Sequence, residues 1–134
     1  MKALLINPWT KKVTPIIIDD KLSLERCQSL LGGYVEKVPW DYDQDDKPLH
    51  FTHKNDLLVH EEGLFQGFTH GFTIKGIWPQ PILGMGLIIG VDIKKGKWID
   101  VDESLFESPN RVEGLMNWST VQSPVFKNYL EQFA

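Results

Sequence analysis

The longest strongly apolar run in the chain, residues 82–91, constrains the fold most. It contains ten residues, of which three are glycines. A helix that crosses a bilayer needs about 20 apolar residues, so this run is too short to be one. A continuous apolar run of this length is typical of a strand whose two faces are both covered. We therefore expect residues 83–91 to form the central strand of a sheet, and the protein not to engage a membrane.

Short apolar segments on both sides of this run predict further strands. Residues 2–6 and 13–18 are expected to pair across a turn, and Pro15 favours an edge or a bulge position for the second of them. Most connections are too short for a parallel crossover, which predicts a largely antiparallel sheet. Residues 76–81 contain two prolines and a glycine and predict a loop. Further strands are expected at residues 34–38, 57–60 and 98–101, and a hairpin tip with a small basic cluster at residues 94–97.

Helix signals appear early and late in the chain. One helical stripe is expected to end at the glycine pair 32–33 and consists of Leu24, Cys27, Leu30 and Leu31. Asp102 is a candidate cap for a short helix, and Ser123 with Pro124 starts a C-terminal helix. The chain, residues 1–134, thus predicts one small α+β domain with a short helix after the second strand. Residues 102–134 are expected to form a C-terminal helical extension.

The order of four segments resembles a known family. The segments are KALLINP, LLGGYVEKVP, DLLVHEEGLFQG and ILGMGLIIGVD, and the resemblance runs over residues 1–101. It is a resemblance to small proteins of phages and plasmids, catalogued as domain of unknown function 3846. The stretch FTHGFTIKGIWPQP departs from the family pattern. The resemblance implies an order of elements and a phage setting, and it implies no catalytic residue.

The charge and cysteine content limit the partners and the compartment. The net charge is -4, and only two of the 14 basic residues, Arg26 and Arg111, are arginines. Proteins that bind duplex DNA usually carry a basic stripe rich in arginine, so nucleic acid is disfavoured as a partner. The single Cys27 forms no disulfide within the chain, and no export signal is visible, so we expect a cytoplasmic protein. A homo-oligomer is an open alternative.

An acidic segment, DYDQDD, raises the question of a metal site. Asp41, Asp43 and Asp45 alternate as the first ligands of a calcium-binding EF-hand loop do. The sixth position of such a loop requires glycine and the twelfth glutamate, but here they are Asp46 and Thr52. A solvated loop is therefore expected, with a weak calcium site as the alternative. No cofactor is expected.

The histidines and the glycine-rich run do not form a recognisable catalytic motif. The four histidines are expected at the surface, and they are His50, His53, His60 and His70. They lack zinc-ligand spacing, because no HExxH pattern or second cysteine accompanies them. The glycines at 84, 86 and 90 lie within the apolar run and are expected to bend a strand rather than to bind a dinucleotide. Cys27 is expected in the core.

One enzyme-like pattern stays open. Asp92 and Lys94 follow the apolar run, and Asp56 lies upstream. Magnesium-dependent nucleases use acids and a lysine at such a strand end to hold the metal and activate water. The alternative is that Lys94 belongs to a hairpin turn without chemistry.

The five tryptophans are the strongest indication of a binding surface. Tryptophan is enriched at interfaces and in ligand pockets. We expect the surface at Trp78, with Phe72, Gln80 and the turn at Trp9 beside it. The alternative is that Trp78 folds inward and closes the core.

Taken together, these features predict a small non-enzymatic binding protein. A phage accessory protein that engages a host protein is the first hypothesis. The second is a module that binds a small molecule or nucleotide, with a subunit interface as one location for the ligand. The third is the magnesium-dependent nuclease.

Overall fold

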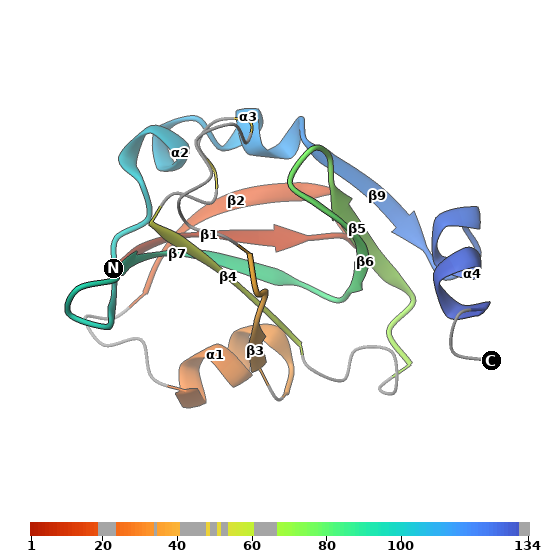
Figure 1. Cartoon of the computed structure of the whole chain (residues 1–134), viewed down its shortest axis with the longest axis horizontal. Coiled ribbons are helices and arrows are strands. Elements are labelled where there is room, and N and C mark those ends of the chain that lie inside the picture. Colours follow the sequence, from red (N-terminus) through yellow and green to blue (C-terminus); the bar gives the residue numbers. More distant parts are fainter. Residues whose placement is uncertain are drawn as a thin grey trace.

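Two antiparallel sheets share one hydrophobic core (Figure 1). The computed structural model describes residues 1–18, 24–33, 35–40, 48, 51, 54–60 and 67–131. Within them, the first sheet has the order β2-β1-β7-β4-β3, with β8 also paired to β7, and the second has the order β6-β5-β9. The strands are β1 Lys2–Asn7, β2 Lys12–Ile17, β3 Val35–Lys37, β4 Asn55–His60, β5 His70–Ile74, β6 Trp78–Leu83, β7 Gly86–Asp92, β8 Lys97–Ile99 and β9 Met116–Thr120. The predicted α+β fold with mostly antiparallel sheets is confirmed.

Strand β7 has both faces buried, as the apolar run predicts. Its side chains alternate between faces. Ile88 points into the core that the two sheets share, whereas Leu87 and Ile89 point into a second cluster on the other face of the first sheet. Helix α1, Leu24–Leu31, covers that second face with Cys27 and Leu31. In Figure 1, α1 accordingly lies on the side of the first sheet away from β5, β6 and β9.

The helix ends follow the local signals in the sequence. The N–H groups of Gly32 and Gly33 both donate to the Gln28 carbonyl, which closes α1 at the predicted residue. Short helices α2, Glu103–Glu107, and α3, Pro109–Glu113, lead into β9, and α4 is Pro124–Glu131. Among the described residues, no helix is long and apolar enough to cross a membrane.

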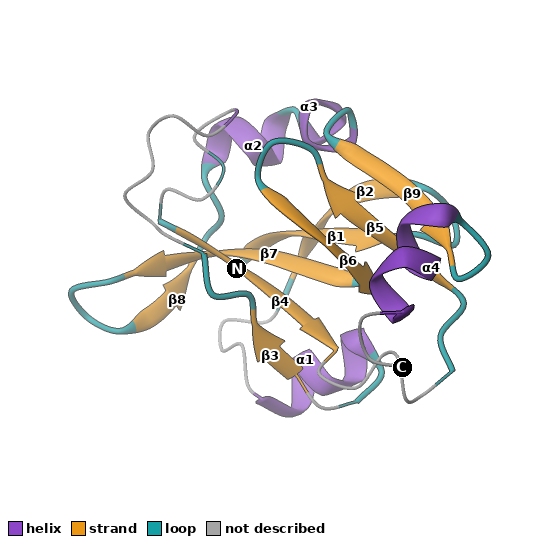
Figure 2. Ribbon diagram, turned by 45° about the vertical axis from the view of Figure 1, so that its right-hand side comes forward, coloured by secondary structure: helices purple, strands orange, loops and turns teal. Residues whose placement is uncertain are grey.

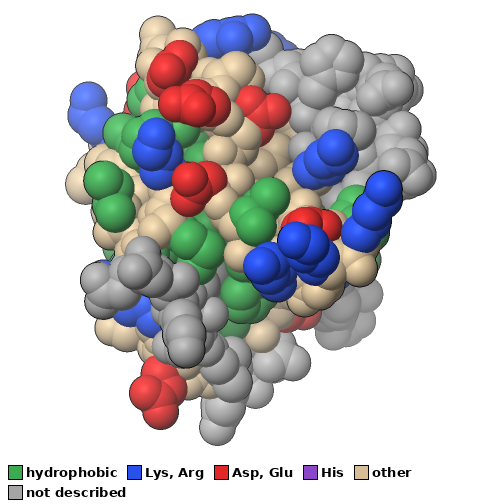
Figure 3. All heavy atoms as spheres, turned by 90° about the vertical axis from the view of Figure 1, so that its left-hand side faces the viewer, with side chains coloured by type: hydrophobic (Ala, Val, Ile, Leu, Met, Phe, Trp, Pro, Cys, Tyr) green, Lys and Arg blue, Asp and Glu red, His purple; other side chains and the backbone are tan. Residues whose placement is uncertain are grey.

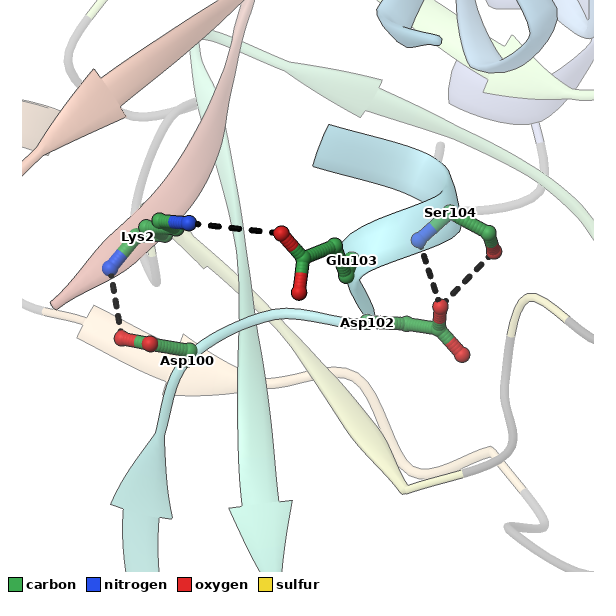
Figure 4. Close-up of polar contacts among 5 residues, drawn as sticks. All are labelled: Lys2, Asp100, Asp102, Glu103 and Ser104. Carbon is green, nitrogen blue, oxygen red and sulfur yellow. Dashed lines mark hydrogen bonds and ion pairs between the residues drawn. The ribbon is translucent and has the colours of Figure 1, made fainter. Parts of the chain in front are cut away.

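A polar network ties the start of β1 to α2 (Figure 4). The Lys2 N–H donates to the Asp100 carboxylate at 2.8 Å, and the Lys2 ammonium lies 3.5 Å from the Glu103 carboxylate. The Asp102 carboxylate accepts from the backbone N–H and the hydroxyl of Ser104, at 2.9 and 2.7 Å. Asp102 is therefore the N-cap that the sequence predicts.

Hydrogen-bond register explains why Pro15 lies in an edge strand. The Ile18 N–H donates to the Met1 carbonyl. The backbone N–H and C=O groups of the even-numbered residues of β2 therefore point toward β1, and those of the odd-numbered residues point away from the sheet. Pro15 is at an outward position, where its missing N–H costs no ladder hydrogen bond. The outward N–H of Val13 donates to the Glu113 carboxylate of α3 at 2.9 Å. The predicted edge position is confirmed.

The prediction of a loop at residues 76–81 is wrong, because this segment enters β6 at Trp78. Strand β6 is an edge of the second sheet. The Gly84 N–H donates to the His70 carbonyl at 2.9 Å. In this register the backbone hydrogen-bonding groups of Ile82 point toward β5, and the backbone of Pro81 points away from the sheet. A proline-rich segment is compatible with a strand at such a position.

The expectation that residues 102–134 form a helical extension is also wrong. Strand β9 lies within this segment and pairs with β5 along its whole length. Leu105, Val112 and Met116 belong to the core between the sheets. The segment is therefore part of the domain core, and its strand was missed because MNWST has little apolar character.

Two glycines of the apolar run have different roles. Gly84 has a φ of +96° and forms the turn between β6 and β7. The expectation that residues 83–91 form one strand, bent at Gly84, is therefore wrong, because Leu83 ends β6 and β7 begins at Gly86. Gly90 lies within β7, and a Cβ atom there would be 2.0 Å from the Asp100 carbonyl oxygen. Gly90 thus allows a close approach between two backbone segments.

We expect Gly90→Ala to destabilise the protein by about 2 kcal/mol or more, because the added methyl group overlaps a backbone atom. Gly114→Ala is the matched control. Gly114 has a φ of -64°, and a Cβ there would meet its nearest neighbour at an ordinary 3.5 Å. This control should be neutral or stabilising by up to about 1 kcal/mol. Urea unfolding followed by circular dichroism measures both, and equal effects would contradict the close approach.

Candidate functional site

The turn between β1 and β2 presents Trp9 at the surface. The Asn7 side-chain oxygen accepts the N–H groups of Trp9 and Thr10, at 3.0 and 3.3 Å. Asparagine favours such a turn because its side chain bonds the backbone two residues on. Lys11 completes the turn with a φ of +56°. The tip is thus held by its own hydrogen bonds, and Trp9 is 42% exposed on it.

Three further rings lie beneath Trp9 and form with it what we name the Trp9 cluster: Trp9, Phe68, His70 and His60. Trp9 contacts the Phe68 ring edge-on, with centroids 5.8 Å apart, and the His70 ring at 5.6 Å with a tilt of 32°. Phe68 in turn contacts His60 edge-on at 5.0 Å. His60 ends β4 and His70 begins β5, so the cluster joins the hairpin tip to both sheets.

Glycines allow the rings to pack closely. A Cβ at Gly84 would lie 2.8 Å from the Phe68 ring, and a Cβ at Gly33 would lie 2.3 Å from Nε2 of His60. Both distances are too short for any other residue without a shift of the rings. The two glycine motifs of the sequence, GG and GMG, therefore border this cluster.

The surroundings of Trp9 combine an apolar anchor with positive charge. Lys11 and Lys12 follow it in the turn and at the start of β2, and both are exposed. Thr69 holds the His70 ring through a 2.8 Å hydrogen bond between the Thr69 hydroxyl and Nδ1. The site can therefore offer a large, firmly held indole to an apolar group and two cations to neighbouring acids.

The structure separates the residues that were predicted to form one surface. Trp9 and Gln80 are exposed, but Phe72 is completely buried in the core, so its prediction as a surface residue is wrong. Trp78 is half-buried and packs against the same core. Its inward packing agrees with the alternative that Trp78 closes the core.

Trp9 and Trp78 also lie at opposite ends of β5. Trp9 contacts His70, the first residue of that strand, whereas Trp78 pairs with Ile74, the last. Four residue steps along a strand span about 13 Å. The expectation that the Trp9 turn neighbours Trp78 is therefore wrong, and Trp9 alone among the tryptophans is exposed within the described residues.

The histidine predictions have mixed outcomes. His60 is only 4% exposed, so its prediction as a surface residue is wrong, and His70 is half-buried. His50, His53 and the acidic loop with Asp41, Asp43 and Asp45 lie outside the described residues. No sequence signal indicated the association of Trp9 with His60, Phe68 and His70, because it depends on how the β1–β2 turn, the end of β4 and residues 68–70 meet.

The structure does not bring the nuclease residues together. Asp56 is buried, and its Oδ2 accepts the indole N–H of Trp98 at 2.9 Å. Asp56 lies two residues from Leu58 and so faces the α1 side, whereas Asp92 lies four residues from Ile88 and faces the other side. The Asp92 carboxylate accepts the Lys95 N–H in the predicted hairpin turn.

Other metal and nucleophile chemistry finds no support in the part of the chain that the structure describes. There, no group of three or more His, Cys, Asp or Glu side chains is placed to hold a metal ion. Cys27 is fully buried in the second cluster, as predicted, and burial raises the pKa of its thiol. A thiol with a raised pKa is a poor nucleophile.

A second exposed surface carries isoleucines but is more broken up. Ile17, Ile93 and Ile99 are exposed, the last two on the β7–β8 hairpin with Lys94 and Lys95 at its tip. On the face shown in Figure 3, hydrophobic side chains alternate with basic and acidic ones and do not merge into one apolar area. The Trp9 cluster is therefore the better candidate for a binding site.

No family model, no curated protein and no solved structure matches this chain. The resemblance to the phage and plasmid family therefore stays a prediction.

We expect Trp9→Ala and Phe68→Ala to be energetically coupled by about 1 kcal/mol, the usual size for an edge-to-face aromatic pair. A double-mutant cycle on the free energy of unfolding in urea measures this coupling. Trp9→Ala combined with Ile99→Ala is the control. Asp100, next to Ile99, bonds Lys2 at the far end of β1, so these two changes should add within about 0.5 kcal/mol. A coupling of zero for the Trp9–Phe68 pair would show that the cluster does not hold Trp9 in place.

Proposed function

We propose that this chain is a small non-enzymatic binding protein that uses Trp9 to anchor a partner protein. The observation that carries the proposal is the exposure of a large aromatic side chain on a turn that is fixed by Asn7 and supported by Phe68 and His70. Exposed tryptophans of this kind are the residues that most often dominate the free energy of binding at protein interfaces.

The rigidity of the Trp9 turn lowers the free-energy cost of binding a partner. Binding costs free energy when side chains and loops must be ordered, about 0.5–1.5 kcal/mol for each mobile side chain. The turn at Trp9 is closed by two hydrogen bonds to the Asn7 side chain, and the indole rests on two rings. Little ordering is therefore left to occur when a partner binds.

The charges beside Trp9 favour a partner with an apolar group among acidic residues. Lys11 and Lys12 would form the rim of such an interface, where charges speed association more than they add affinity. The resemblance to phage and plasmid proteins supports a host protein of the bacterial cytoplasm as this partner. The rival proposal of a nucleotide or other small anionic ligand fits the same combination of an aromatic face and cations.

We expect Trp9→Ala to weaken partner binding by about 2 kcal/mol or more, roughly 30-fold in dissociation constant, because it removes the anchor. The partner would first be captured from bacterial lysate by the immobilised protein, then purified and titrated by calorimetry. Gln80→Ala, which removes an exposed side chain of β6, should leave the affinity unchanged.

Two outcomes would contradict the proposal. One is equal affinity of the wild type and Trp9→Ala for the purified partner. The other is a Trp9→Ala variant whose loss of binding is matched by a large fall in melting temperature. A thermal shift with a nucleotide panel that Trp9→Ala abolishes, without any captured protein, would instead favour the small-molecule alternative.

A further inference from the structure

Most edges of the two sheets are closed to a further strand. The outer side of β2 holds Pro15 and a Val13 N–H that is already bonded to Glu113. The outer side of β6 holds Pro81, which has no N–H to donate. Strands β3 and β8 have three residues each. Proline, covering side chains and short strands are the usual means by which proteins prevent edge pairing.

Strand β9 is different, because among the described residues none of these devices is found along its outer side. Its sequence, MNWST, has five residues with no proline and no charge. The Val121 N–H donates to the Thr69 carbonyl and the Lys75 N–H donates to the Leu115 carbonyl, at 3.0 and 2.8 Å. In this register the backbone N–H and C=O groups of the odd-numbered residues of β9 bond with β5, so those of Met116 and Trp118 point away from the sheet.

Within the described residues, nothing pairs with the outer side of β9. The strand order of the second sheet ends at β9. Helix α4 contacts both β9 and β6, which lie on opposite sides of β5, so it lies across the sheet and not along its outer edge (Figure 2). In Figure 1, β9 accordingly runs along the margin of the molecule.

We propose that a second copy of this chain occupies the outer edge of β9, antiparallel to it and centred on Trp118. In this register, the N–H and carbonyl of Trp118 meet those of Trp118 in the second copy, and both donors find acceptors. Asn117 lies opposite Ser119 of the second copy, and Met116 opposite Thr120. Because the strand is uncharged, a two-fold axis brings no like charges together.

The side chains and the existing hydrogen bonds set the strength of this pairing. Trp118 already packs edge-on against Phe72, with centroids 6.4 Å apart, so the dimer would set two supported indoles side by side. The Thr120 carbonyl, however, already accepts from the N–H and the hydroxyl of Ser123. A single strand edge also buries less than the roughly 1,600 Å² of a standard interface. We therefore expect a dimer that dissociates in the micromolar range.

Charges placed at the two facing positions test both the dimer and its register. Sedimentation velocity over about 1 to 500 μM should show a monomer–dimer equilibrium for the wild type. Asn117→Lys with Ser119→Lys sets like charges opposite each other and should weaken the dimer at least about tenfold. Gln80→Lys with Ser29→Lys adds the same charge at exposed residues of β6 and α1 and should dimerise like the wild type.

Variants of opposite charge should pair with each other if the dimer has the register centred on Trp118. The Asn117→Lys/Ser119→Lys variant mixed with the Asn117→Glu/Ser119→Glu variant should form a heterodimer that is tighter than the homodimer of either variant. Circular dichroism checks that every variant is folded. A wild type that stays monomeric throughout the range would overturn the proposal, and so would a dimer that the charge variants do not weaken.

Discussion

The burial of β7 on both faces is the constraint on which the other elements depend. Ile88 completes the core between the two sheets, while Leu87 and Ile89 complete the cluster beneath α1. The same strand pairs with β1 on one side and with β4 on the other. One apolar segment therefore fixes the order of the layers, and the second sheet and α1 take opposite faces because each face needs cover.

Sequence reasoning succeeded where the local signal was strong. The β1–β2 hairpin, α1 with its glycine stop, the central strand and the Asp102 cap all follow from short-range chemistry. It failed for β6 and β9, whose own residues argue against a strand. Prolines in β6 and polar residues in β9 are accepted because β5 lies between them and supplies the hydrogen bonds. Such tertiary pairing is not visible in single segments.

The candidate site shows a similar division. Trp9 could be predicted as a surface residue from the local sequence, because it is an aromatic residue in a predicted turn. In the structure the Asn7 side chain accepts its N–H. Phe72 was predicted at the surface because it was grouped with the proline-rich segment at Trp78, whereas it lies within β5 and its side chain is buried. The approach of these rings to Trp9 brings together the β1–β2 turn, the end of β4 with His60, and residues 68–70. The nearest sequence signal was the pair of glycine motifs that border the rings.

The bond between the Val13 N–H and the Glu113 carboxylate joins residues 100 positions apart. On a ribosome that adds about 5–20 residues per second, the β1–β2 hairpin waits at least several seconds for this acceptor. Strand β1 also waits for β7, since Leu4 pairs with Ile88. For those seconds the outer edge of β2 has no acceptor for the Val13 N–H, and the apolar face of the hairpin has no partner to pack against. Pro15 has no N–H to offer at this edge from the moment it is synthesised. It therefore disfavours the pairing of β2 with a strand of another chain before Glu113 has been added.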